Sequence, residues 1–171
     1  MIDYRDILKK INTLIFDYDG VLTDGNIWLV SDNNFVRTSN IKDGYILQLA
    51  AKKGFKIVII SGSDSEVIKK RFSKLGITDV FLCIENKLKF YKDYITKNNI
   101  DSKNVLYMGD DIPDYEIMLN VGLPVCPADA VEEIKSISKY ISHKNGGQGC
   151  VRDIVEQVLK INDKWMDEIS Q

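Results

Sequence analysis

Two pairs of aspartates, each placed just after an apolar run, are the residues of this chain best suited to chemistry. Asp17 and Asp19 follow the run Leu-Ile-Phe, and Asp110 and Asp111 follow Val-Leu-Tyr-Met-Gly. A helix cap or a turn would explain any one of these residues alone. Four carboxylates gathered at one place repel one another unless a cation offsets their charge. Mg²⁺ fits, because it binds through one or two carboxylates, waters and the phosphate oxygens of a substrate.

The apolar runs predict β-strands, and amphipathic patterns predict helices between them. The strands are expected at 13–16, 56–60, 79–82, 105–108 and 123–125. The helices are expected near 43–53, 64–75, 87–98, 114–121 and 130–137, with another near 151–161. Strands that alternate with helices predict an α/β fold with a Rossmann-like, doubly wound parallel sheet covered on both faces. The continuous apolar character of the strands agrees, since such strands are buried on both sides.

The carboxyl ends of the strands are where an open parallel sheet binds its ligands. Polar residues follow three of the predicted strands. Lys87 is expected at the start of the helix that follows a fourth strand. The residues expected to meet at this edge are Asp17, Asp19, Ser61, Gly62, Lys87, Asp110 and Asp111.

The segment 26–39 interrupts the alternation of strands and helices. Two β-rich stretches flank the polar sequence Ser-Asp-Asn-Asn, a pattern that predicts a β-hairpin inserted after the first strand. The hairpin carries more apolar residues than a solvent-facing excursion should: Ile27, Trp28, Leu29, Val30, Phe35 and Val36. Such a patch indicates an interface, although packing back onto the chain's own domain is the alternative.

Length and composition predict one globular domain spanning 1–171. The net charge of −2 gives no basic surface for nucleic acid. No apolar run approaches the roughly 20 residues of a membrane span, and the first residues lack a signal peptide, so a cytoplasmic location is expected. Cys83, Cys126 and Cys150 lack the paired spacing of a metal or redox site and are interpreted as free thiols.

Four short motifs resemble those of the haloacid dehalogenase superfamily of phosphatases. They are Asp-Tyr-Asp-Gly-Val at 17–21, Ile-Ile-Ser-Gly at 59–62, Lys87, and Gly-Asp-Asp-Ile-Pro-Asp at 109–114. The resemblance implies that Asp17 is the nucleophile and Asp19 the general acid and base. It also implies phosphate binding by Ser61, Gly62 and Lys87. Asp17, Asp19 and Asp110 would hold Mg²⁺, with Asp114 in support.

These roles explain why such residue types are needed. Phosphate monoesters hydrolyse extremely slowly in water, and an aspartate nucleophile divides the reaction into formation and hydrolysis of an aspartyl-phosphate. Asp19 would protonate the leaving alkoxide and then take a proton from water. Lys87 and a metal ion would offset the repulsion between Asp17 and the phosphate.

The intervals between the motifs leave no room for a folded cap domain. Besides the hairpin, four stretches are similar to one capless group: Asp-Gly-Val-Leu-Thr-Asp-Gly at 19–25, Asp-Gly-Tyr at 43–45, Leu-Gly-Ile at 75–77 and Gly-Gly-Gln-Gly-Cys-Val-Arg-Asp-Ile-Val-Glu at 146–156. The chain resembles in these features the phosphatases of 3-deoxy-ulosonate phosphates such as KDO 8-phosphate. That resemblance implies a homotetramer with hairpins at its centre and Gly146–Gly149 close to a neighbouring subunit's Asp17. Further candidates for binding the sugar-acid phosphate are Arg37, Lys74 and Arg152.

Two alternatives stay open at this point. Relatives specific for KDO 8-phosphate carry Arg directly after the glycine of the second motif, and relatives acting on KDN 9-phosphate carry Glu there with a Lys on the next helix. This chain has Ser63 at that position, with Lys74 at a spacing that could match the second pattern. A non-catalytic module that has kept the fold is the other alternative, and the complete set of ionisable residues speaks against it.

Overall fold

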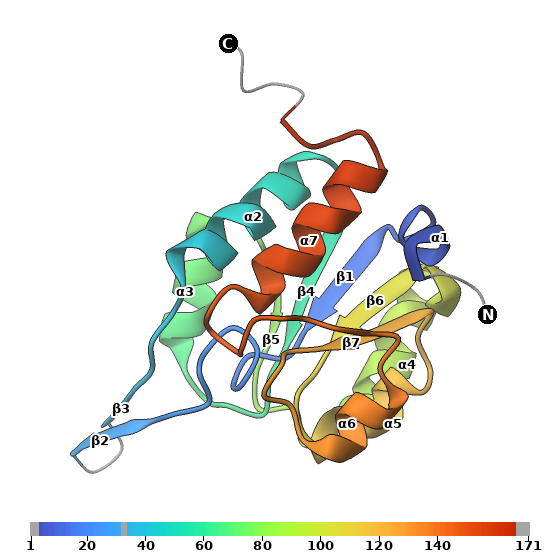
Figure 1. Ribbon diagram of the computed structural model, residues 1–171. Helices are drawn as coiled ribbons and strands as arrows, with labels where there is room; N and C mark the ends of the chain where they lie inside the picture. The colour runs from blue at the N-terminus through green and yellow to red at the C-terminus, as the bar shows by residue number, and fades with distance from the viewer. Residues whose placement is uncertain (1–3, 32–33, 167–171) are drawn as a thin grey trace.

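The sheet at the centre of the molecule has six parallel strands. A computed structural model describes residues 4–31 and 34–166 (Figure 1). In chain order the strands are β1 (Thr13–Phe16), β4 (Lys56–Ile60), β5 (Asp79–Phe81), β6 (Val105–Met108), β7 (Leu123–Cys126) and β8 (Tyr140–Ile141). Their spatial order is β5-β4-β1-β6-β7-β8, and each neighbouring pair is parallel. The predicted doubly wound α/β fold is confirmed.

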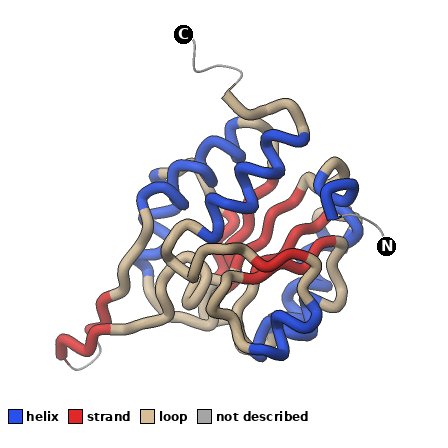
Figure 2. Tube along the Cα trace, viewed as in Figure 1, coloured by secondary structure: helices blue, strands red, loops and turns tan. Residues whose placement is uncertain are grey.

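Helices cover both faces of this sheet (Figure 2). One face packs against α1 (Tyr4–Leu8), α2 (Ile41–Lys52), α3 (Glu66–Lys74) and α7 (Cys150–Ile161). The other face packs against α4 (Lys87–Lys97), α5 (Tyr115–Met118) and α6 (Glu132–Ile137). Two short 3₁₀ turns, η1 (Ser102–Asn104) and η2 (Ile112–Asp114), precede β6 and α5. None of the described helices is long and apolar enough to cross a membrane.

The apolar strands divide their side chains between two cores. In β1, Leu14 and Phe16 enter the core beneath α2 and α7, whereas Ile15 enters the core beneath α4 and α5. Successive side chains of a strand point to opposite faces, so both sets are buried. This two-sided burial is why the strand sequences are continuously apolar.

Among the described elements, one strand and one helix were not predicted from the sequence, and several helices are shorter than expected. The strand β8 has only two residues, too few for a periodic pattern, and is defined by its pairing with β7. The helix α1 has five residues. The helix expected at 114–121 begins as the 3₁₀ turn η2 and ends as α5 at Met118.

The predicted hairpin is present and projects from the body of the molecule (Figure 1). Its strands, β2 (Trp28–Ser31) and β3 (Asn34–Val36), form a separate antiparallel sheet. Residues 32–33 of the predicted turn lie outside the described residues. Apart from this hairpin and the segment containing α3 and β5, the described chain has no insertion between its motifs that could form a cap.

Ile154 tests the contribution of α7 to the core. Its side chain is completely buried, so Ile154→Ala should lower the free energy of unfolding by about 2–5 kcal/mol through lost burial and a residual cavity. Ile41→Ala is the matched control, because Ile41 is 81% exposed, and it should change stability by less than about 0.5 kcal/mol. Urea denaturation followed by circular dichroism measures both. Equal effects of the two substitutions would contradict the assignment of α7 to the core.

Candidate active site

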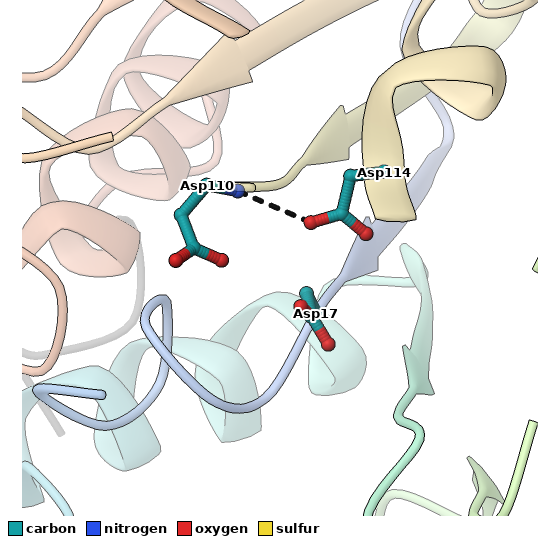
Figure 3. A group of neighbouring side chains, drawn as sticks. All are labelled: Asp17, Asp110 and Asp114. Atoms are coloured by element: carbon teal, nitrogen blue, oxygen red, sulfur yellow. Dashed lines mark hydrogen bonds between the residues drawn. The ribbon is translucent and has the colours of Figure 1, made fainter. Parts of the chain in front are cut away.

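Three aspartates converge at the carboxyl edge of the sheet (Figure 3). Each of Asp17, Asp110 and Asp114 offers a carboxylate oxygen, and these oxygens lie within 4.8 Å of one another. The strands β1 and β6 pair in parallel with Phe16 opposite Met108, so the residues that follow them emerge side by side. The register continues one step further, because the Asp17 amide donates to the Met108 carbonyl at 3.0 Å.

Lys87, the first residue of α4, lies between two of these carboxylates. Its Nζ is 2.9 Å from Asp17 Oδ2 and 2.7 Å from Asp114 Oδ1, and its side chain is 7% exposed. Burial alone would lower the pKa of Lys87, but Asp17 and then Asp114 raise it above its ordinary value. The ammonium group therefore stays charged inside the site.

Asp114 is fully buried and has its hydrogen bonds satisfied by the protein. Its Oδ1 accepts from Lys87 and from the Tyr107 hydroxyl at 2.6 Å, and its Oδ2 accepts from the Asp110 amide at 3.1 Å. A side chain on Gly109 would collide with Asp114, since an added Cβ would lie 2.4 Å from the Asp114 Cβ. Asp114 is therefore a positioning residue that orients Lys87 and the loop after β6.

Asp110 has a carboxylate oxygen in need of a partner. Its Oδ1 is buried without a hydrogen bond in the described structure. Burial, and next the charge of Asp114, raise the pKa of Asp110 to about 7, although Lys87 opposes the shift. Burial and Asp114 likewise raise the pKa of Asp17. A divalent cation held by Asp17 and Asp110 would satisfy the free oxygen and stabilise both ionised carboxylates.

The carboxylate of Asp19 faces away from this cluster. Its Oδ1 accepts from Arg37 Nε at 2.7 Å, and its Oδ2 accepts from the Ser63 hydroxyl. The Asp19 side chain therefore lies outside the cluster of Asp17, Asp110 and Asp114, and a part for Asp19 in holding Mg²⁺ stays a prediction. Asp17 and Asp19 occupy different environments, one beside Lys87 and the other beside an arginine from the hairpin.

The second motif borders the same edge. Ser61 is buried at the end of β4, and its Oγ accepts from the Ser63 amide at 3.0 Å, which shapes a tight turn. Gly62 lies exposed at the tip of this turn. The backbone amide of Ile84 donates to the Ser61 carbonyl, so the segment leading to Lys87 is fastened to this turn.

Two predicted substrate-binding residues lie elsewhere. Lys74 occupies the last turn of α3, which starts at the carboxyl edge and runs back along the sheet, so Lys74 is exposed near the opposite edge. Arg152 lies in the first turn of α7, where its Nε is 3.3 Å from Glu156 and its guanidinium group lies over Trp165. Lys74 is therefore distant from the site of its own chain, whereas the predicted contact of Arg152 with substrate at a neighbouring subunit stays a prediction.

The glycine-rich segment Gly146–Gly149 packs against its own chain. The Gly147 amide donates to the Val21 carbonyl at 2.9 Å, and a Cβ added to Gly146 would lie 1.9 Å from the Gly20 carbonyl oxygen. Gly20 has φ +81°, and a Cβ there would lie 2.0 Å from Asp110 Oδ2. These glycines permit close packing onto the loop after β1, and their expected position beside a neighbouring subunit stays a prediction.

Two residues that support the site were missed from the sequence. The Thr23 hydroxyl accepts from the amides of Gly20 and Gly25, both at 3.2 Å, and so closes the loop after β1. Asp43 Oδ1 accepts from the Arg152 amide at 2.7 Å, which caps the start of α7. In the sequence, Asp43 belongs to the Asp-Gly-Tyr stretch near the start of α2 and lies on the helix face that carries core side chains, but neither feature indicates its contact with α7.

The fold and this arrangement of carboxylates and lysine define a hydrolase of the haloacid dehalogenase-like class, and residues 84–154 match that family. A 3-deoxy-D-manno-octulosonate 8-phosphate phosphatase of Salmonella typhi is 34% identical over 160 residues, covering 94% of this chain and 85% of the relative. The chain therefore belongs to the KDO 8-phosphate phosphatase family of haloacid dehalogenase-like hydrolases.

Solved structures agree with this assignment. The phosphatase of this name from Yersinia pestis superposes with a TM-score of 0.93 at 30% identity, covering 96% of this chain and 89% of that one. The Moraxella catarrhalis phosphatase, solved with magnesium, phosphate and KDO, gives a TM-score of 0.92 at 29% identity, covering 96% and 95%.

The raised pKa of Asp110 predicts a pH-dependent stability of the metal-free protein. A carboxyl group whose folded-state pKa is about 7, against an ordinary 3.8, destabilises the folded state increasingly as pH rises between these values. In excess chelator, Asp110→Asn should therefore raise the free energy of unfolding at pH 8 by about 1–4 kcal/mol and have little effect at pH 4.

Denaturant unfolding of the wild type and the variant at these two pH values measures the difference. Asp93→Asn is the control, because Asp93 is exposed on α4. A stability gain for Asp110→Asn that is the same at both pH values would contradict the assigned titration.

Proposed function

We propose that this chain, acting as a single domain over residues 1–171, is a Mg²⁺-dependent phosphatase that hydrolyses KDO 8-phosphate through an aspartyl-phosphate. The observation that carries the proposal is the buried Lys87 ammonium group between Asp17 and Asp114, next to the unpartnered Asp110 oxygen. Lys87 supplies a cation for the phosphate, and Asp17 supplies a nucleophile. The relatives named above support the substrate, since they act on KDO 8-phosphate.

The first half of the reaction uses the environment of Asp17. The Tyr18 amide donates to Asp17 Oδ1 at 2.7 Å and Lys87 holds Oδ2, so the orientation of the carboxylate is fixed before substrate arrives. Mg²⁺ bound by Asp17 and Asp110 would supply further positive charge against the phosphoryl oxygens. Asp17 attacks phosphorus, and Asp19 gives a proton to the departing sugar oxygen.

The second half releases phosphate. Asp19, now ionised, takes a proton from the water that attacks the aspartyl-phosphate, and Asp17 is regenerated. Arg37 and Ser63 hold the carboxylate of Asp19 in one orientation between the two proton transfers. A non-catalytic module would not need this second, separately held carboxylate.

The proposed function is tested by phosphate release from KDO 8-phosphate, with KDN 9-phosphate and D-arabinose 5-phosphate as competing substrates. KDO 8-phosphate should give the highest kcat/KM, chelation should abolish turnover, and Mg²⁺ should restore it. Asp17→Asn should lower kcat by at least about 10³-fold and leave no phosphoenzyme, because the nucleophile is gone.

A matched control variant makes this test decisive. Asp93→Asn makes the same chemical change at an exposed position and should retain turnover. Full activity in excess chelator, or normal turnover by Asp17→Asn, would refute the proposed mechanism. A higher kcat/KM for KDN 9-phosphate would leave the mechanism intact and change the substrate, an outcome that the uncharged Ser63 makes worth measuring.

A homotetramer and a cytoplasmic location complete the proposal. The hairpin supports assembly, because Trp28 is 67%, Leu29 74% and Val30 62% exposed in the single chain. An apolar patch of this kind on a projecting element is suited to burial against copies of itself.

Leu29→Glu should break this assembly by placing a charge in the apolar contact. Light scattering of the wild type should give about four times the 19.5 kDa mass of the chain, and the variant should give a lower mass. Val67→Glu introduces the same charge at a 72% exposed position on α3 and should leave the mass unchanged. A monomeric wild type at micromolar concentration would reject the assembly.

A further inference from the structure

Three side chains from distant parts of the sequence form a closed hydrogen-bonded ring beside the nucleophile. Arg37 Nε donates to Asp19 Oδ1 at 2.7 Å, and its Nη2 donates to Ser63 Oγ at 2.9 Å. The Ser63 hydroxyl in turn donates to Asp19 Oδ2. Arg37 directly follows β3, and its side chain is only 18% exposed, so it lies in the site and away from solvent.

The position of the ring separates two sides of the site. Lys87, Asp17 and Asp110 surround the place where the phosphoryl group reacts. Asp19, as the proton donor to the departing oxygen, must face the part of the substrate that leaves. Arg37 contacts Asp19 and therefore borders the sugar acid instead of the phosphoryl group.

A sugar acid brings a carboxylate that needs a cation on this leaving-group side. Lys74 lies near the opposite edge of the sheet, and Arg152 is engaged with Glu156. Arg71, the half-buried arginine of α3, donates from its Nη2 to the Asn40 carbonyl. Among these candidates, Arg37 alone contacts a residue of the proposed reaction.

Arg37 also has hydrogen-bond donors left for a ligand. A guanidinium group carries five N–H donors, and the contacts with Asp19 and Ser63 in the described structure engage two nitrogen atoms. Its planar geometry allows one edge to hold a protein carboxylate while another edge binds a second carboxylate. Ser63 adds no charge of its own, so it leaves the guanidinium charge available.

We propose that Arg37 recognises the carboxylate of the sugar acid with its remaining N–H donors while its Nε holds Asp19 in place. Arg37 is then both the specificity-determining residue for acidic substrates and the positioning residue for the proton donor. This inference rests on the proposed function and names the residue that distinguishes a sugar-acid phosphate from a neutral sugar phosphate.

The test compares a substrate that has the carboxylate with one that lacks it. Steady-state kinetics are measured on KDO 8-phosphate and D-arabinose 5-phosphate for the wild type, Arg37→Gln and Arg37→Lys. Loss of a charge-assisted hydrogen bond should raise the KM for KDO 8-phosphate about 10- to 100-fold in Arg37→Gln. The KM for D-arabinose 5-phosphate should change less than about threefold, because no carboxylate contact is lost.

The positioning role has its own readout. Because Asp19 loses its partner in Arg37→Gln, kcat should fall on both substrates by a similar factor, whereas KM should rise on one alone. Arg37→Lys keeps the charge but cannot hold both carboxylates, so it should restore part of the KM and little of kcat. Lys97→Gln, which neutralises an exposed cation in the last turn of α4, should match the wild type on both substrates.

A binding measurement separates this inference from the proposed function. Calorimetric titration of the intact protein with KDO should show weaker binding to Arg37→Gln than to wild type and Lys97→Gln, with circular dichroism confirming that each variant is folded. Equal KM changes on both substrates, or unchanged KDO binding, would overturn carboxylate recognition by Arg37. A wild type that hydrolyses D-arabinose 5-phosphate better than KDO 8-phosphate would refute the proposed substrate before any variant is considered.

Discussion

The rest of the site depends on the ion pairs that bury Lys87 between Asp17 and Asp114. Removing an ammonium group and two carboxylates from water is unfavourable unless their geometry is good and their remaining hydrogen bonds are made. Asp114 meets this condition with three donors, and Lys87 is held at 2.9 and 2.7 Å from its two partners. Asp110 adds a further carboxylate without a cation of its own, and burial followed by the charge of Asp114 raises its pKa to about 7. The negative charges of the site therefore outnumber its positive charges, and a bound metal ion would offset the difference.

Such a cluster requires a rigid surrounding, and close backbone contacts provide it. The loop after β1 is enclosed between Asp110 on one side and the segment before α7 on the other, with Gly20 and Gly146 nearly touching. The amide of Gly146 is also held by Asp129 Oδ1 at 2.9 Å. These glycines contribute no chemistry, yet any side chain would force the carboxylates apart. The helix α7 therefore matters to the active site through the loop that precedes it, and Asp43 matters because it caps that helix.

The sequence predicted the central strands and the edge of the sheet where the motifs meet, because two-sided burial and the parallel arrangement leave strong local patterns. It also predicted that Asp17, Lys87 and Asp110 would come together, since each follows or precedes a recognisable element. Lys74 lies away from the catalytic edge of the sheet because of helix geometry. The nine residues of α3 rise by roughly 13 Å and place this lysine at the far end of the helix. The contact between Asp19 and Arg37 had no local signal, since it depends on how the hairpin returns to the sheet.

The two sides of the site are therefore built from parts of the fold with different constraints. The phosphoryl side is made by adjacent core strands and a buried ion pair, so it tolerates little change without loss of stability. The side that we propose for the leaving group is made by Arg37 at the base of an exposed hairpin and by Ser63 on a turn. Neither residue belongs to the hydrophobic core. Substitutions there can alter which sugar is accepted while the nucleophile and its lysine stay in place. Because the same hairpin exposes Trp28 and Leu29, burial of these side chains against another copy of the chain would also restrain Arg37, and the proposed substrate recognition would then be coupled to the proposed assembly.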